Sequence, residues 1–287
     1  MFKNMLAFVW IFPLCAAAIF IVTALGGMAA TSMGLPAPEI PAGSDQTVLG
    51  QYLLITSLIS AAGLAALAPN LSGRFMPRWL TLSVLIWVAY GVNNILEGAV
   101  FTSMSAASLF TVVLYFFASF LCGAAAAWLF PPQDREERFA DLVKQFFARY
   151  PGTALAWRTL AAWLAFPFIY LAFGRLIAPL VMDYYEQGLF GLSLPGWGQI
   201  LPLVAVRSLL FLFACLPMLI LWDASPRRLF WVLGLNLFLL VGGLNMLQAY
   251  LMSDNLRIIH SLEILADEMI YAGVLVLLVA SNETTQA

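Results

Sequence analysis

A succession of apolar runs constrains what this chain can fold into. A helix needs about twenty apolar residues to cross a bilayer, and in lipid its backbone polar groups must be satisfied within the segment. The chain is 63% hydrophobic and 10% charged, whereas soluble domains carry about 25% charged residues. The runs predict an all-α integral membrane protein with eight transmembrane helices, at residues 5–30, 49–69, 78–100, 107–130, 156–179, 199–222, 229–250 and 257–280.

Basic residues gather in one set of alternate loops. They are Lys3, Arg74, Arg78, Arg135, Arg138, Lys144, Arg149, Arg158, Arg227 and Arg228. The other long loops, 31–48 and 180–198, carry only acidic charges. Because basic loops stay on the cytoplasmic side, we expect a multi-pass inner-membrane protein with both termini in the cytoplasm. The first run is too long for the apolar core of a signal peptide, so we interpret it as a span.

The net charge is −2, which argues against a nucleic-acid partner. The expected partners are the lipid bilayer and a small-molecule ligand. The three cysteines, Cys15, Cys122 and Cys215, all fall inside apolar runs, which is typical of buried free thiols. We therefore expect neither a disulfide nor a cofactor.

The chain also repeats itself at a fixed spacing. Three pairs of identical residues are each 151 positions apart: Gly91 and Gly242, Asn94 and Asn245, Leu96 and Leu247. The repeat predicts two tandem four-helix halves, residues 1–130 and 153–287, whose pseudo-twofold axis runs along the membrane normal. At this spacing four apolar residues fall opposite His260, Glu263, Asp267 and Glu268. They are Leu109, Val112, Phe116 and Phe117. The second half is therefore predicted to carry most of a single polar site.

The segment between the halves, residues 131–152, has the pattern of an amphipathic helix. Its large apolar residues recur at helical spacing, at Phe139, Leu142, Val143, Phe146 and Phe147. Basic residues accompany them, so we expect this linker to lie on the cytoplasmic membrane surface near anionic headgroups.

The stretch from Arg257 to Tyr271 is a membrane span loaded with ionisable groups. It contains Asp267, Glu268, Glu263 and His260, which is the only histidine of the chain. A charged group costs at least about 2.5 kcal/mol at the centre of a membrane helix, so such residues face protein or water. The stretch indicates a polar site or a polar core.

The predicted depth of the polar side chains in the bilayer forms a second pattern. With the predicted orientation, nearly all intramembrane polar side chains fall in the outer half of the bilayer. We therefore expect one outward-facing pocket lined by Glu97, Arg207, Gln248, Arg257, His260 and Glu263.

Two sets of candidate site residues follow. His260, Glu263 and Glu97 could serve acid–base chemistry, because histidine exchanges protons near physiological pH and Glu263 shares its helix face. The candidates for contacting a ligand are Arg207, Arg257, Arg175, Gln248, Asn94, Asn245 and Asp267. The structural alternative is that the charges pair with one another and the asparagines join helices. A single histidine without further metal-binding spacing makes a metal site the minority interpretation.

Three functions are compatible with these patterns. The first is binding or transport of a small anionic or zwitterionic solute, with protons coupled through the carboxylate–histidine set. The second is an intramembrane enzyme, acid–base or metal-assisted, acting on a lipid or an outer-leaflet substrate. The third is a membrane sensor or assembly scaffold in which the ion pairs are structural. A Gly-rich phosphate loop and a soluble domain are absent from the sequence.

Overall fold

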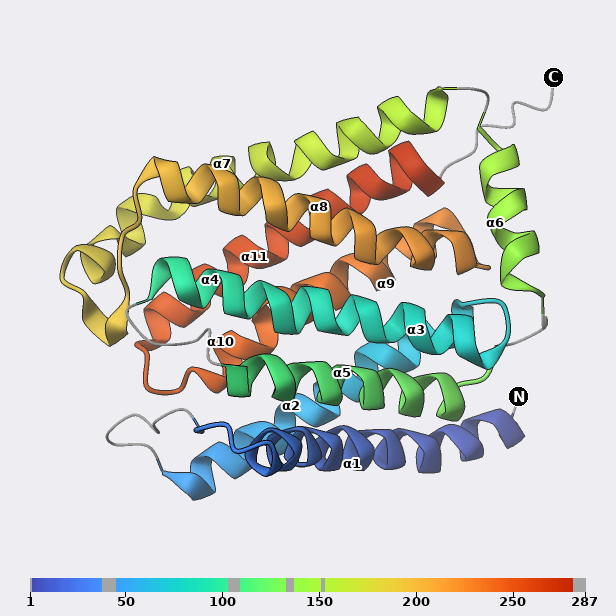
Figure 1. Cartoon of the computed structure of the whole chain (residues 1–287), viewed down its shortest axis with the longest axis horizontal. Coiled ribbons are helices and arrows are strands. Elements are labelled where there is room, and N and C mark those ends of the chain that lie inside the picture. The colour runs from blue at the N-terminus through green and yellow to red at the C-terminus, as the bar shows by residue number, and fades with distance from the viewer. Residues whose placement is uncertain (1, 38–44, 103–108, 133–136, 151–152, 281–287) are drawn as a thin grey trace.

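A computed structural model describes residues 2–37, 45–102, 109–132, 137–150 and 153–280 of the chain. Within these ranges the regular structure is helical, and β-type pairing is limited to two isolated bridges. The long helices lie side by side in one bundle (Figure 1). The α-helices are α1 Phe2–Ser32, α2 Gln46–Leu67, α3 Phe75–Ile86, α4 Asn93–Phe101, α5 Leu109–Leu129, α6 Phe139–Ala148, α7 Ala154–Glu186, α8 Trp197–Leu221, α9 Pro226–Phe238, α10 Leu244–Gln248 and α11 Asp254–Leu275.

Short 3-10 and π segments join or extend several of these helices. The 3-10 segments are η1 Ala68–Asn70 and η3 Leu189–Gly191, and the π segments are η2 Trp87–Val92, η4 Leu239–Gly243 and η5 Val276–Ala280. Segments η2 and η4 each connect two α-helices into one continuous rod, α3–η2–α4 and α9–η4–α10. A π segment inside an α-helix often marks a functional region.

Seven helices of the described chain are long and apolar enough to cross a membrane. They correspond to the first seven predicted spans. The predicted span at 257–280 is helical too, as α11 and η5. It does not belong to this apolar set, because it carries Arg257, Glu263, Asp267 and Glu268. The chain thus has the helices of a multi-pass membrane protein.

The exposure of apolar side chains also indicates a membrane protein. Large apolar residues are exposed along the outside of the bundle, among them Trp10, Trp128, Phe168, Phe213 and Leu277. Soluble monomers rarely expose contiguous apolar surface on this scale, whereas lipid contact requires it. The interior is packed around aromatic residues: the Phe166 ring lies 5.1 Å from the rings of Phe211 and Tyr271.

The helices form two groups with matching contacts. In the first, α1 packs on α2 and α5, and α3 packs on α5. In the second, α7 packs on α8 and α11, and α9 packs on α11. The groups meet where α3 contacts α8 and α9 contacts α2.

Backbone pairs join the two groups at the end of the bundle where α6 lies. Leu71 and Trp222 form an isolated antiparallel bridge. The amide of Ser72 donates to the Leu221 carbonyl at 2.7 Å, and the amide of Asp223 donates to the Asn70 carbonyl at 2.9 Å. Near the opposite end, the Asn245 side chain donates to the Asn94 side chain at 2.6 Å, and these two residues are 151 positions apart. The same spacing separates Leu71 from Trp222.

Helix α6 lies across one end of the bundle (Figure 1). Its Leu142 and Phe146 side chains are buried, while Phe139 and Phe147 are exposed. The start of α1 and the end of η5 lie at this same end of the bundle. An even number of passes between them would produce this arrangement.

Arg78 ties helix ends together at the α6 end. Its side chain is 2% exposed. The guanidinium donates to the carbonyls of Ala127 and Ala68 at 3.0 Å each, and to that of Phe130. The last carbonyls of a helix have no partner within the helix, so Arg78 satisfies the ends of α2 and α5 together.

We therefore expect Arg78→Met to lower the free energy of unfolding by about 2 kcal/mol or more, because each buried carbonyl left without a donor costs about 1–3 kcal/mol. The Ala68 carbonyl keeps the Leu71 amide as a donor at 3.3 Å. Thermal unfolding of the purified protein in detergent measures this loss. Arg74→Met is the matched control, since Arg74 is exposed on the same helix turn. Equal stability of the two variants would contradict the assignment.

Candidate functional site

A cavity of about 500 Å³ opens among α4, α7, α8 and α11, toward the end of the bundle away from α6. Four of the six residues predicted to line one pocket do line it: Glu97, Arg207, His260 and Glu263. Arg175 and Asp267, two of the other candidates, line it as well. These residues come from α4, α7, α8 and α11, which are distant in sequence.

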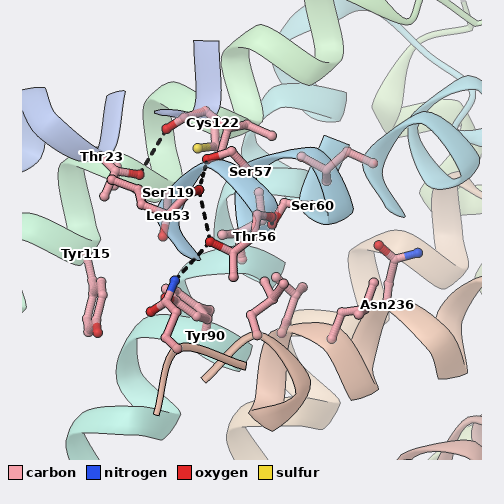
Figure 2. A pocket seen from close by; sticks show the side chains of 18 of the residues that line it. Thr23, Leu53, Thr56, Ser57, Ser60, Tyr90, Tyr115, Ser119, Cys122 and Asn236 are labelled. Carbon is pink, nitrogen blue, oxygen red and sulfur yellow. Dashed lines mark hydrogen bonds between the residues drawn. The ribbon is translucent and has the colours of Figure 1, made fainter. Parts of the chain in front are cut away.

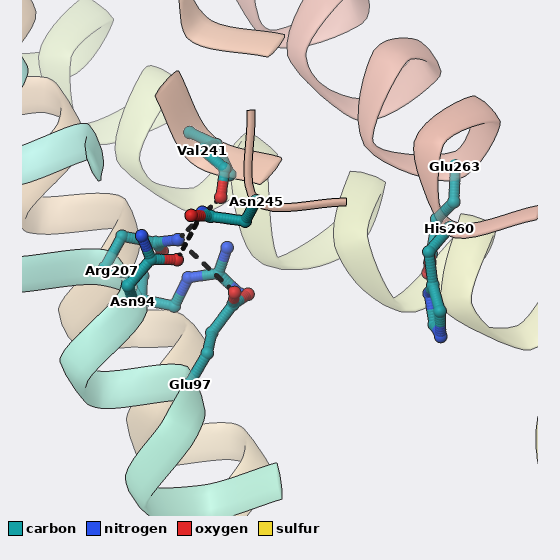
Figure 3. A network of polar contacts seen from close by, with 8 residues as sticks. Asn94, Glu97, Arg207, Val241, Asn245, His260 and Glu263 are labelled. Atoms are coloured by element: carbon teal, nitrogen blue, oxygen red, sulfur yellow. Dashed lines mark hydrogen bonds and ion pairs between the residues drawn. The ribbon is translucent and has the colours of Figure 1, made fainter. Parts of the chain in front are cut away.

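Arg207 and Glu97 form an ion pair in the wall of the cavity. Arg207 Nη1 lies 2.7 Å from Glu97 Oε1, which joins α8 to α4 (Figure 3). Asn93 Nδ2 donates to the other Glu97 oxygen at 3.3 Å and to the Val241 carbonyl at 3.2 Å. The pair therefore bridges the two helix groups and is held in place by a residue one turn from Glu97.

The surroundings of Arg207 explain how a buried cation is tolerated. The side chain is 3% exposed. Its guanidinium carbon lies 5.0 Å from the Tyr170 ring centroid and 5.6 Å from those of Phe166 and Phe211. Aromatic faces attract a cation, and more so away from water. The Glu97 side chain is 30% exposed, so the pair presents its carboxylate to the cavity and buries its guanidinium.

A second polar group lies on α11, apart from the ion pair (Figure 3). His260 Nδ1 is 2.8 Å from Glu263 Oε2, and His260 Nε2 is 3.3 Å from the hydroxyl of Tyr185 on α7. The carboxylate thus orients the imidazole, and the phenol contacts its other nitrogen. Such a chain can hold a proton at either ring nitrogen.

Two further carboxyl groups, those of Asp267 and Glu268, line the cavity on the same helix as His260 and Glu263. Asp267 is 4% exposed and Glu268 is 1% exposed, and both line the cavity. Asp267 Oδ1 and Glu268 Oε2 have no hydrogen-bond partner among the described residues. Burying polar oxygens without partners is unfavourable. Arg207 Nε, in the same site, also lacks a hydrogen-bond partner among the described residues.

The rest of the wall is apolar. Toward the open end the lining includes Val181, Leu192, Pro195 and Leu256. Among the lining residues, Arg175, Leu194 and Trp197 are exposed. Leu194 and Trp197 lie just before and at the start of α8, at the open end of the cavity.

Other predicted site residues lie elsewhere. The Arg257 guanidinium donates to the carbonyls of Met246 and Leu247, at 2.8 and 3.0 Å, and lies 3.2 Å from Asp254. It satisfies the end of α10 and is not part of the cavity lining. Asn94 and Asn245 bond to each other. This is the structural role that the sequence left open for the asparagines.

Gln248 lines a second, smaller cavity of about 80 Å³. Figure 2 shows this cavity with Thr56 and Tyr90 in its wall. Its Nε2 donates to Thr56 Oγ1 at 3.0 Å. Gln248 is 151 residues from Glu97, and Thr56 is 151 residues from Arg207. Each cavity thus contains a polar contact between the two helix groups, and the residues of one contact are 151 positions from those of the other; the first contact is charged and the second neutral. The other polar side chains that line the small cavity include Thr23, Ser57, Ser119, Tyr90 and Asn236, and the rest of its lining is largely apolar.

Sequence reasoning did not single out the two tyrosines of the site. Tyr170 lies under Arg207, and Tyr185 contacts His260. Both tyrosines belong to α7, most of whose residues are apolar. No spacing in the sequence connects them with residues on α8 or α11. The hydroxyl of Tyr170 inside an apolar run is a weak signal, and Tyr185 lies among Asp183, Tyr184 and Glu186 near the end of α7.

Among the described residues, no group of three or more His, Cys, Asp or Glu side chains converges as a metal site would require. The three cysteines are buried and free. No protein-family model matches the chain, and neither a curated protein nor a solved structure is significantly similar to it.

The Glu97–Arg207 pair leads to a thermodynamic prediction. Removing one partner of a buried ion pair costs about 3–5 kcal/mol, whereas replacing both with neutral groups can be nearly neutral. We expect Glu97→Gln and Arg207→Thr each to lower the thermal stability. The double variant, which reproduces the Gln248–Thr56 pair of the small cavity, should be more stable than either single variant. Additive losses in this double-mutant cycle would show that the pair is not coupled.

Proposed function

We propose that this chain is an eight-span inner-membrane protein of two four-helix halves, and that its large cavity faces outward and binds a small zwitterionic solute. Transport of that solute, with protons carried by the carboxylate–histidine set, is the activity that this arrangement suits best. The observation that carries the proposal is a sizeable membrane-depth cavity holding both an arginine and unpaired carboxyl groups. Charged groups in such a cavity are typical of substrate and ion pathways.

The two-halves proposal, with halves 1–130 and 153–287, rests on contacts between equivalent positions. The Leu71–Trp222 bridge and the Asn94–Asn245 hydrogen bond each join residues 151 apart. Residues related by a twofold axis contact each other only on that axis, so these two contacts define its course. One contact lies at the α6 end and the other near the opposite end. The axis therefore runs along the helices, as expected for two parallel repeats in a membrane.

The eight-span proposal includes α11, although it is the least apolar long helix. Its charged residues Glu263, Asp267 and Glu268 face the cavity instead of the outside. After Asp254 and Asn255 in its first turn, its exposed residues are Ile258, Leu262, Ile270 and, in η5, Leu277, all of them apolar. This division into an apolar outer face and a polar inner face suits a helix that lines a cavity in a membrane.

The orientation proposal uses the α6 end as the cytoplasmic side. The basic residues Arg74, Arg138, Arg227 and Arg228 all belong to segments at that end. The exposed Phe139 and Phe147 of α6 could enter the headgroup region, with Lys144 beside them. This supports a linker helix, within residues 131–152, on the cytoplasmic membrane surface. The cavity mouth then faces the outer side.

The charge of the cavity favours a zwitterion over a simple anion. Four carboxyl groups line it, namely Glu97, Glu263, Asp267 and Glu268. The cationic groups are Arg175 and Arg207, together with His260 when it is protonated. Because Arg207 already pairs with Glu97, an anion alone would meet more negative than positive groups. A solute that carries both charges could engage both kinds of group.

The proposal is tested by binding of 2-aminooctanoate, a zwitterion with an apolar tail. We expect the purified wild-type protein to bind it and proteoliposomes to accumulate it. The Glu97→Gln/Arg207→Thr double variant should fold but bind it at least about tenfold more weakly, a loss of about 1.4 kcal/mol. A control pair, Asn94→Ala/Asn245→Ala, changes an inter-helix contact outside the cavity lining and should retain binding. Absence of binding by the wild type would overturn the proposal.

A second candidate is acid–base chemistry on a membrane-borne substrate. The observation that favours it is the Glu263–His260–Tyr185 chain, in which a carboxylate orients an imidazole beside an open space. General bases are commonly held in this way.

If the chain is catalytic, His260→Gln should abolish turnover of outer-leaflet lipids, while 2-aminooctanoate binding persists. Mass spectrometry of lipids in proteoliposomes measures this, with Ser261→Ala as the control on the same helix. Identical lipid profiles for wild type and His260→Gln would exclude this second candidate.

A further inference from the structure

We propose that Asp267 and Glu268 form a subsite for the ammonium group of the solute, so that the ligand is an amine with an apolar portion that enters amine first. This inference rests on the proposed function and specifies the ligand class of the same cavity. It also assigns a role to the two carboxyl groups that neither the ion pair nor the histidine chain engages.

The first argument is their position and lack of partners. Asp267 and Glu268 are 4% and 1% exposed, and both contribute to the cavity wall. One oxygen of each lacks a hydrogen-bond partner in the described part of the chain. The nearby guanidinium of Arg207 is engaged by Glu97 at 2.7 Å. A cationic donor entering the cavity would satisfy oxygens that the protein leaves free.

The second argument compares Asp267 and Glu268 with the residues at the matching positions of the first half, which line the small cavity. Contacts between helices identify those matching positions. A side chain at Gly91 would meet Tyr115 on α5, and a side chain at Gly242 would meet Ile264 on α11. Tyr115 and Ile264 are therefore equivalent, and they are 149 residues apart. A second contact gives the same result. Ser83 contacts Gly123, and Gly234 contacts Ala272. Gly123 and Ala272 are again 149 residues apart.

The spacing of 149 between α5 and α11 differs from the constant spacing of 151 that the sequence predicts for the whole repeat. In sequence, Phe116 and Phe117 fall opposite Asp267 and Glu268. The contacts instead make Ala118 and Ser119 the equivalents of the two carboxylates, and both line the small cavity. The difference is explained by a connection before the last helix that is shorter in the second half.

Comparing the matching positions shows which charged residues helix packing does not require. The same helix position is filled by Ala118 and Ser119 in one half and by Asp267 and Glu268 in the other. Arg207 likewise corresponds to Thr56. The helices of the first half pack without any of these charges, so the fold does not require them. Burying carboxyl groups without need is unfavourable, which favours a ligand as the reason for their presence.

The third argument is the order of polar and apolar surface along the cavity. The apolar lining residues Val181, Leu192 and Leu256 lie toward the mouth, and Asp267 and Glu268 lie at the deep end. A ligand that satisfies both surfaces has its cationic group deep and its apolar part near the mouth. A volume of about 500 Å³ accommodates such a small molecule.

The test compares three probes with one chain length: octylamine, octanoate and 2-aminooctanoate. Binding to the full-length protein in nanodiscs is measured by calorimetry. The variant is Asp267→Ala/Glu268→Ser, which introduces the residues that the equivalent positions already have. The control is Asp183→Ala/Glu186→Ser, which removes two exposed carboxyl groups from α7 outside the cavity lining.

We expect the wild type and the control to bind octylamine and 2-aminooctanoate more tightly than octanoate. The variant should keep its thermal stability and bind both amines at least about tenfold more weakly, while octanoate binding does not fall. Retained amine binding by a folded variant, with 2-aminooctanoate still bound by the wild type, would overturn the ammonium subsite and leave the proposed function standing. If the wild type binds none of the probes, both fall. If the variant does not fold, the single changes Asp267→Asn and Glu268→Gln, which preserve volume, give the same comparison.

Discussion

The structure depends on how a chain with apolar surroundings accommodates charge. Charged groups in a low-dielectric medium must be paired or must face water. Arg78 meets this condition by donating to three helix-end carbonyls, and Arg257 by donating to two. Arg207 meets it with Glu97 and a set of aromatic rings. Each solution joins elements that are distant in sequence, so the charges also fix how the helices are arranged.

Two of the carboxyl groups do not follow this rule. Asp267 and Glu268 are buried, and each has an oxygen that no described residue satisfies. In the equivalent part of the other cavity the chain uses Ala118 and Ser119. Under the proposed two-half arrangement, positions that are charged in one half and neutral in the other are dispensable for packing. This comparison directs attention to the second half as the functional one.

Two polar contacts join the two groups of helices. Glu97 extends from α4 to Arg207 on α8, and Gln248 extends from α10 to Thr56 on α2. The first contact depends on charge and could be broken by a competing ligand or a proton. The second is neutral and does not depend on charge. If the halves move, the charged side is the one that a solute can open, which is consistent with a single functional cavity.

The sequence by itself determined the helical membrane class, the first seven spans and most of the cavity's charged residues, because hydrophobic length and buried charge are local properties. It could not decide which polar residues share a cavity. Gln248 and Arg257 were expected beside Glu97, yet one lies in the small cavity and the other satisfies the end of α10. It also missed Tyr170, Tyr185 and the register of the last helix. These depend on how helices rotate and pack against partners far along the chain, which only the tertiary structure decides.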